Sequence, residues 1–97
     1  MDIDEASDDS LSEILDLLVA EIAAAPHSAA ALTLYALVST LEHEQAGYLF
    51  KLEKLRDLSA SQRVLAYRLI ELMAQARNRG RDWQAAKARM DGLVRSG

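Results

Sequence analysis

The chain of 97 residues contains no cysteine, one proline and four glycines, and only five of its residues are Trp, Tyr or Phe. Without cysteine, disulfides, thiolate zinc sites, iron–sulfur clusters and a thiol nucleophile are excluded. The longest hydrophobic run is Leu34–Val38, which is far shorter than the roughly 20 residues of a membrane-spanning helix. No basic and hydrophobic leader opens the chain. We therefore expect a cytoplasmic protein that has no membrane partner.

The scarcity of glycine and proline, with abundant Ala, Leu, Arg and Glu, favours helix over sheet. The sequence predicts an all-α fold, a small helical bundle of about four helices. Residues 10–97 are expected to form a single helical domain. Residues 1–9 are acidic with little to bury, so we predict a disordered tail there.

Charge is distributed unevenly along the chain. Residues 1–50 contain ten acidic residues and no Lys or Arg, whereas residues 51–97 contain all eleven Lys and Arg and five acidic residues. The formal net charge of −4 therefore combines an acidic first half with a basic second half. Two explanations stay open. Either the acidic first helix packs on the basic C-terminal helices of its own chain, or the pattern serves an outside partner.

The first and last helices are predicted from hydrophobic spacing and end signals. Ser10 and Glu13 match a capping box, so we expect a helix over 10–24. A last helix over 83–94 begins after Asp82, which can cap it. The residues expected to face the core from these two helices are Leu11, Ile14, Leu15, Leu18 and Ile22, and Trp83, Ala86 and Met90.

A second capping box, Ser59 with Gln62, predicts a helix that runs to about Arg79, with Gly80 as its C-terminal glycine. Its hydrophobic residues recur at helical spacing and should face the core. These are Val64, Leu65, Leu69, Leu72, Met73 and Ala76, with Tyr67 and Ile70 widening the stripe.

Residues 29–57 contain no helix breaker other than Gly47, and their a and d heptad positions are hydrophobic over nearly four repeats, with one polar interruption at Gln45. This pattern predicts one long central helix over 29–57, which would reach about 43 Å, beyond the width of about 34 Å of a compact domain this size. The helix must kink at Gly47 or project, and projection would expose a hydrophobic seam that a homodimer would cover. The candidate interface residues are Leu34, Val38, Leu41, Gln45, Tyr48, Phe50, Leu52 and Leu55.

Metal and catalytic sites find little support. The chain has only His27 and His43, and neither follows a glutamate by three residues, as di-iron helix bundles require. On a helix, Glu42, His43 and Glu44 point about 100° apart and cannot converge on one ion. Ser39 with His43 lacks an orienting carboxylate for nucleophilic catalysis. The sequence predicts no metal, no cofactor and no enzymatic activity.

Basic residues gather near the C-terminal end, around a single tryptophan. They can contact an acidic partner or the phosphates of a nucleic acid, on which the indole would stack. The overall acidity of the chain favours the acidic protein partner. The candidate residues are Arg77, Arg79, Arg81, Trp83 and Arg89.

The same region, residues 76–86, resembles the Gly-Asp-Trp hairpin turns of small helical export chaperones of the flagellar type. Arg81 interrupts the Gly-Asp step in this chain. The resemblance covers about a tenth of the chain and implies a helical hairpin. It carries over no residue-level function.

The expected function is a non-enzymatic one. The charge asymmetry and the two-faced central helix indicate a small accessory, adaptor or regulatory protein that acts through protein–protein interaction, as a homodimer or with one protein partner. A nucleic-acid-associated regulator is the alternative. A small enzyme or ligand carrier, with a pocket at Tyr35, Ser39 and His43, is the least favoured reading.

Overall fold

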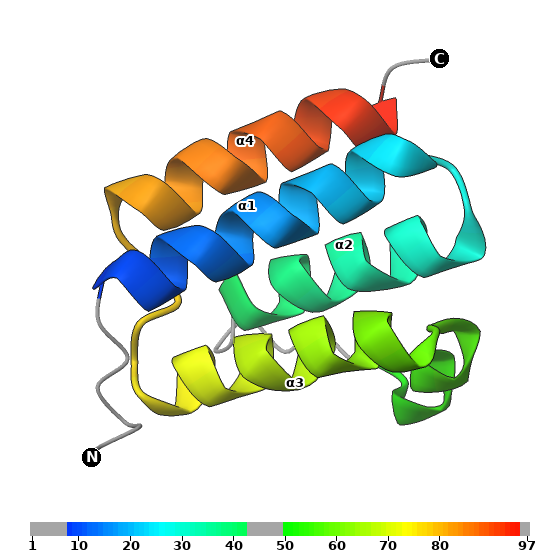
Figure 1. Ribbon diagram of the computed structural model, residues 1–97, viewed down its shortest axis with the longest axis horizontal. Coiled ribbons are helices and arrows are strands. Elements are labelled where there is room, and N and C mark those ends of the chain that lie inside the picture. Colours follow the sequence, from blue (N-terminus) through cyan, green and yellow to red (C-terminus); the bar gives the residue numbers. More distant parts are fainter. Residues whose placement is uncertain (1–7, 43–49, 96–97) are drawn as a thin grey trace.

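The computed structural model describes residues 8–42 and 50–95, and every regular element within these ranges is a helix (Figure 1). The predicted all-α fold class is confirmed. The elements, in chain order, are α1 (Asp8–Ala24), α2 (Ala29–Glu42), the short 3-10 helix η1 (Leu52–Asp57), α3 (Ala60–Ala74) and α4 (Arg81–Arg95).

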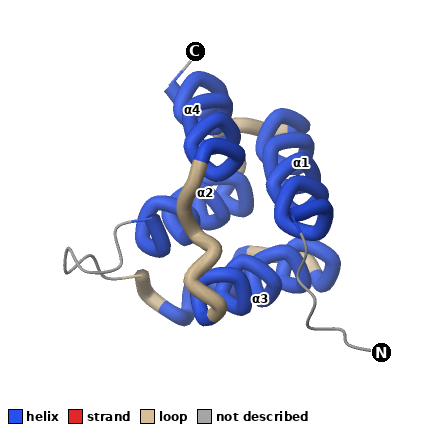
Figure 2. Tube along the Cα trace, turned by 90° about the vertical axis from the view of Figure 1, so that its left-hand side faces the viewer, coloured by secondary structure: helices blue, strands red, loops and turns tan. Residues whose placement is uncertain are grey.

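Helix α1 packs against all three of the other α-helices. It contacts α2, α3 and α4, and seen end-on the four α-helices surround one shared core (Figure 2). Its buried residues recur at helical spacing, as the sequence predicts. The largest fully buried side chains of the core are Leu18, Ile22, Leu34, Val38, Leu69, Trp83 and Met90.

The ends of α1 and α2 have local causes. Helix α1 begins at Asp8, so Ser10 is not its N-cap, and Asp8 and Asp9 belong to the helix rather than to the predicted tail. At the next helix, the hydroxyl of Ser28 accepts from the amide of Ala31 at 3.0 Å and caps α2.

The continuous helix predicted for 29–57 is wrong. Helix α2 ends at Glu42, Phe50 and Lys51 are not helical, and 52–57 form the 3-10 helix η1. The Thr33 hydroxyl donates to the Asp57 carboxylate at 3.4 Å, although one straight helix would hold these residues about 36 Å apart. The chain therefore returns along α2, which keeps the hydrophobic residues of α2 inside one small domain. Gly47 lies outside the described residues.

Helix α3 begins as predicted and ends early. The Ser59 hydroxyl accepts from the amide of Gln62, whose side chain accepts from the amide of Ser59, so this capping box is confirmed. The helix ends at Ala74, before the predicted Arg79. Ala76 adopts a left-handed conformation (φ 61°), and Arg77 N–H donates to the carbonyl of Leu72 at 2.8 Å. This pattern is a Schellman motif, in which alanine occupies the position that usually holds glycine.

We expect Ala76→Gly to raise the free energy of unfolding by about 0.5–1 kcal/mol, because the left-handed strain of an L-residue exceeds the entropy cost of glycine. Urea denaturation measures the change. Gly80→Ala is the matched control: Gly80 has φ +101° and open space around its missing Cβ, so backbone strain alone should lower stability by about 1 kcal/mol. A loss of stability in Ala76→Gly would contradict the interpretation.

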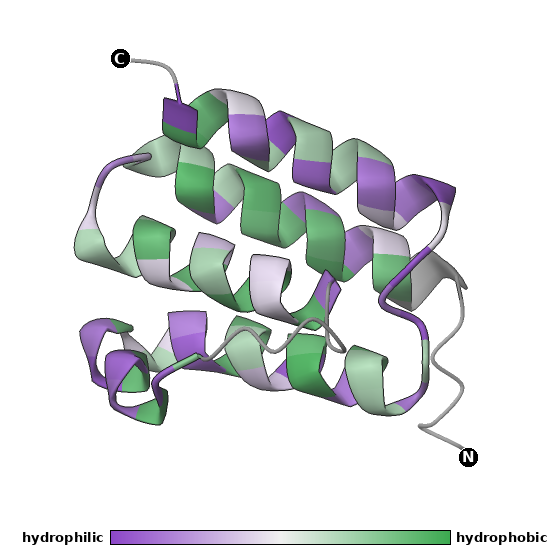
Figure 3. Cartoon of the chain, turned by 180° about the vertical axis from the view of Figure 1, so that it is seen from behind, coloured by the Kyte–Doolittle hydropathy of each residue, from purple (hydrophilic) through white to green (hydrophobic). Residues whose placement is uncertain are grey.

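Hydropathy varies among the helices. The ribbon of α4 is more hydrophilic than those of α1 and α2 (Figure 3). Its core-facing residues Trp83, Ala86 and Met90 are nevertheless buried, as the sequence predicts. None of the helices in residues 8–42 and 50–95 combines the length and the hydrophobicity needed to cross a membrane.

Candidate functional site

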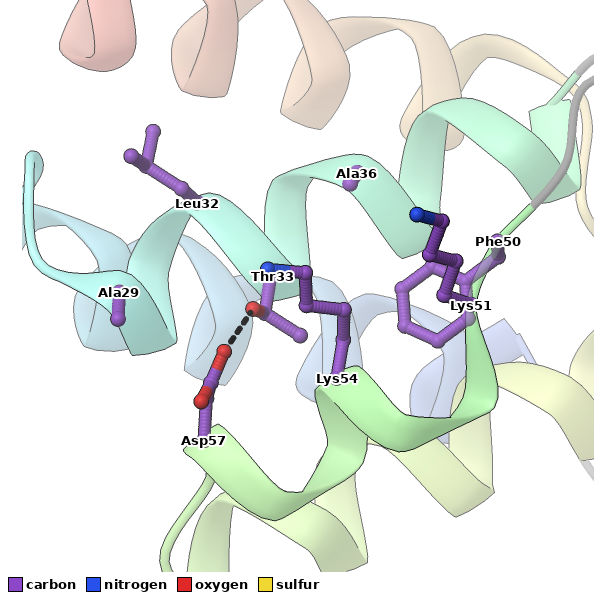
Figure 4. A pocket seen from close by; sticks show the side chains of 8 residues that line it. All are labelled: Ala29, Leu32, Thr33, Ala36, Phe50, Lys51, Lys54 and Asp57. Atoms are coloured by element: carbon purple, nitrogen blue, oxygen red, sulfur yellow. Dashed lines mark hydrogen bonds between the residues drawn. The ribbon is translucent and has the colours of Figure 1, made fainter.

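A groove of about 480 Å³ lies between α2 and η1, and we refer to it as the α2/η1 groove (Figure 4). The α2 side presents small or hydrophobic residues, and the opposite side carries an aromatic ring and three charged residues. The residues that line it are Ala29, Leu32, Thr33 and Ala36 from α2, and Phe50, Lys51, Lys54 and Asp57 from η1 and the residues before it.

The local sequence explains this shape. Ala29 and Ala36 lie one helical turn before and after Leu32 and Thr33. Their small side chains leave space beside α2 that larger side chains would fill. The hydrogen bond from Thr33 to Asp57 fixes the end of η1 against α2. Phe50 is half-buried and packs against the core, which holds the other end of the groove. The groove therefore depends on contacts at both ends of η1.

Charge and hydrophobic surface meet in the groove. Leu32 is exposed, and the side chains of Lys51 and Lys54 extend across the opening toward α2 (Figure 4). Asp57 is engaged by Thr33. An occupant with a hydrophobic side chain and a nearby carboxylate would match this surface, because each lysine offers three hydrogen-bond donors.

A second constellation joins α2 to α4 and consists of Tyr35, Glu42, Lys87 and Asp91, which we call the Lys87 cluster. The Lys87 ammonium lies 3.1 Å from Asp91 and 3.4 Å from Glu42, and 5.0 Å from the centre of the Tyr35 ring. The Tyr35 hydroxyl donates to Asp91. The four side chains satisfy one another, so the cluster clamps the two helices together.

The pKa values in the cluster follow from these contacts. The hydrogen bond from Tyr35, followed by that from Lys87, lowers the pKa of the Asp91 carboxyl. The same bond to Asp91, with burial, raises the pKa of Tyr35. Burial alone would lower the pKa of Lys87, but the bond to Asp91 and the nearby negative charges outweigh burial and raise it. These shifts favour a charged Asp91, a neutral Tyr35 and a charged Lys87 near neutral pH.

The candidate interface residues predicted for 29–57 fall into three groups. Leu34, Val38 and Leu41 are buried in the core of this single chain, so packing inside the monomer covers them. Gln45 and Tyr48 lie outside the described residues. Among the other three, Phe50 and Leu55 are half-buried against the core and Leu52 is exposed. The hydrophobic seam expected to project from the monomer is therefore not exposed at Leu34, Val38 and Leu41.

The basic candidates are only partly brought together. Arg79 lies between α3 and α4 and Arg81 is the first residue of α4; both are exposed, and Arg77 is half-buried. Arg89 lies two turns beyond Arg81, about 12 Å along α4.

Arg89 faces Asp16 of α1 at 3.7 Å, and Trp83 is 1% exposed. The indole therefore belongs to the core and cannot stack on a base in the folded protein. The acidic α1 packs against the basic α4, which is the first of the two explanations for the charge pattern.

His27 takes no part in the α2/η1 groove or the Lys87 cluster. The ring of His27 makes a hydrogen bond of 3.0 Å with the carbonyl of Val94 at the end of α4. His43 lies outside the described residues, as does the Ser39–His43 pairing. Within residues 8–42 and 50–95, no group of three His, Asp or Glu side chains is arranged to hold a metal ion.

Sequence reasoning found Phe50 but missed the other lining residues of the groove. The predicted helix over 29–57 placed Leu32, Ala36, Lys51 and Lys54 along one straight element, where the two pairs could not face each other. Their juxtaposition requires the chain to return along α2, which no local signal announces. Lys87 and Asp91 form an i, i+4 pair that the sequence does present.

Neither the protein-family models, nor the curated proteins, nor the solved structures yield a match to this chain.

Proposed function

We propose that the protein is a non-enzymatic helical module that acts through protein–protein interaction, and that the α2/η1 groove holds its partner. One observation carries this proposal: the groove brings two hydrophobic side chains, the exposed Leu32 and the half-buried Phe50, next to two lysines. The α2 side of the groove is lined by small alanines. The partner is a protein segment that inserts one hydrophobic side chain beside an Asp or Glu.

The energetics favour such a partner. Burying one Leu- or Phe-sized side chain contributes about 1.5–3 kcal/mol. The exposed Lys51 and Lys54 add orientation and a faster association more than affinity. Leu52, directly after Lys51, is 74% exposed and adds a hydrophobic side chain on η1 outside the lining of the groove. A peptide segment can cover both places, whereas a small molecule inside the groove would leave Leu52 in water.

Selection of random dodecapeptides displayed on phage against the purified protein tests the proposal. We expect enriched peptides that share a hydrophobic residue next to Asp or Glu. Fluorescence anisotropy of labelled copies should show that K51E/K54E weakens their binding by about tenfold or more. The matched control is R79E/R81E, which makes the same change in net charge at the connection between α3 and α4 and should bind like the wild type.

A second variant separates the groove from general electrostatics. Ala36→Trp fills the groove from an exposed position and should abolish binding without loss of helical circular dichroism. Peptides that bind wild type, K51E/K54E and A36W equally would overturn the proposal. Retention of a DNA duplex at low salt that R79E/R81E abolishes, with no peptide enriched, would favour the nucleic-acid alternative instead.

A further inference from the structure

Helix α3 exposes a hydrophobic face to solvent, contrary to the expectation that Val64, Tyr67 and Ile70 pack in the core. These side chains are 50%, 52% and 37% exposed. The buried residues Ala66, Leu69 and Leu72 lie on the other side of the helix. In a 15-residue helix whose buried side already contacts α1 and α2, three exposed large hydrophobic residues call for a covering surface.

The order of residues along this face is symmetric about Tyr67. Three positions away on either side are Val64 and Ile70, and seven positions away are Ala60 and Ala74. Four positions away the charges are opposite, Arg63 on one side and Glu71 on the other. All of these positions recur at intervals of three or four residues, so they share one face of the helix.

We propose that this α3 face is a self-complementary interface that binds a second copy of the chain. Two α3 helices run antiparallel about a two-fold axis through Tyr67. In this arrangement Val64 packs on Ile70 of the second copy, and Arg63 faces its Glu71, twice over because the contact is isologous. The small residues Ala60 and Ala74 let the helix ends approach closely.

Charge complementarity selects a second copy over an unrelated partner. A foreign helix needs no symmetric order of residues, whereas in an antiparallel two-fold contact charged residues at mirrored positions attract only if their signs are opposite, as those of Arg63 and Glu71 are. The Arg63 guanidinium donates to the carbonyl of Leu58 at 2.8 Å, and the Glu71 carboxylate accepts from the Gln75 side chain at 2.7 Å. Because a guanidinium has five N–H donors and a carboxylate accepts about four hydrogen bonds, both groups keep capacity for a contact between the two copies. The interface uses a face distinct from the α2/η1 groove.

The size of the face sets the expected affinity. Helix α3 is about 22 Å long, so one helix pair buries less than the roughly 800 Å² per partner of a standard interface. We therefore expect a dissociation constant of about 10 µM to 1 mM. Sedimentation equilibrium over this range should show a monomer–dimer equilibrium.

Charged substitution tests the centre of the face. Tyr67→Arg places two like charges at the two-fold axis and should weaken the dimer by about tenfold or more. Leu52→Arg makes the same kind of change at another exposed hydrophobic residue outside α3 and should leave the equilibrium unchanged. A wild-type chain that is strictly monomeric at 1 mM, or a Tyr67→Arg variant that dimerises as the wild type does, would overturn the proposal.

Disulfide trapping tests the direction of the helices, since the chain contains no cysteine of its own. Val64→Cys and Ile70→Cys proteins, mixed and oxidised with oxidised glutathione, should form the mixed disulfide in preference to either homodimer. In the antiparallel register, two copies of residue 64 lie about 9 Å apart along the helix axis. Preferential Val64→Cys homodimers would exclude the antiparallel contact, and A85C, on the exposed side of α4, should cross-link with neither.

Discussion

Replacement of Trp83 by alanine will lower the free energy of unfolding by about 3–5 kcal/mol. Trp83 is the largest of the fully buried side chains and brings the first turn of α4 into the core. The cavity left by the indole cannot close, because the helices around it are held by their other contacts. A domain of this size has about 5–15 kcal/mol of stability in total, so the variant should lose a large share of it and unfold at a clearly lower urea concentration.

The matched control is Trp83→Phe, with urea denaturation followed by circular dichroism because both variants lack the single tryptophan. The indole nitrogen is buried and has no hydrogen-bond acceptor among the described residues. Phenylalanine removes that unsatisfied donor and keeps most of the volume, so we expect a loss of only about 1 kcal/mol. Equal losses in the two variants would show that the indole does not fill the core as described.

Reversal of the charge at Lys87 will have the second large effect. Lys87→Glu puts a third carboxylate beside Asp91 and Glu42, at a side chain that is 14% exposed. Because a carboxylate without a partner is costly in such a site, we expect the free energy of unfolding to fall by about 2–4 kcal/mol. Lys87→Met, which keeps the packing, should lose about 1 kcal/mol.

These losses should depend on pH in a defined direction. The pKa of Asp91 is lowered from its ordinary 3.8, so the stabilisation by its charged form is complete above that value and is lost as pH falls through the lowered pKa. The differences between the wild type and both Lys87 variants should therefore narrow in acid. Urea denaturation at a series of pH values checks this. If the difference in free energy of unfolding between the wild type and the Lys87 variants stayed constant into acid, the Lys87 cluster would not hold α2 and α4 together as described.

At alkaline pH the Lys87 cluster should also stop stabilising the fold, because Tyr35 and Lys87 lose their protons. The pKa of Tyr35 is raised above its ordinary 10.0. The neutral phenol therefore stabilises the fold below that value, and its contribution is lost as pH rises through the raised pKa. Lys87, whose pKa is raised above 10.5, acts in the same direction.

The helices themselves were predictable because their signals are local. The Ser59–Gln62 capping box uses side chains three residues apart and forms as expected. The buried positions of α1 follow from period 3.6 alone, since any core in contact with the helix selects the same stripe. The end of α3 was missed because Ala76 takes the left-handed position that the sequence suggested for Gly80.

The candidate site was less accessible to sequence reasoning. A hydrophobic heptad seam in 29–57 is compatible with a long rod or with a chain that doubles back, because both cover the same residues. Burial of Leu34, Val38 and Leu41 within the monomer decides against the rod. Likewise, the periodicity of α3 cannot say how wide its buried stripe is, and the structure leaves Tyr67 outside it.

The sequence by itself determined the all-α fold class, the positions of most helices and the core residues of α1 and α4, since these depend on interactions within a few turns of one helix. Only the tertiary structure decided where hydrophobic surface remains exposed and which distant charges meet, as at Lys87 with Glu42. Those features depend on how helices pack against one another. Packing is set by the summed burial of the whole chain rather than by any local pattern.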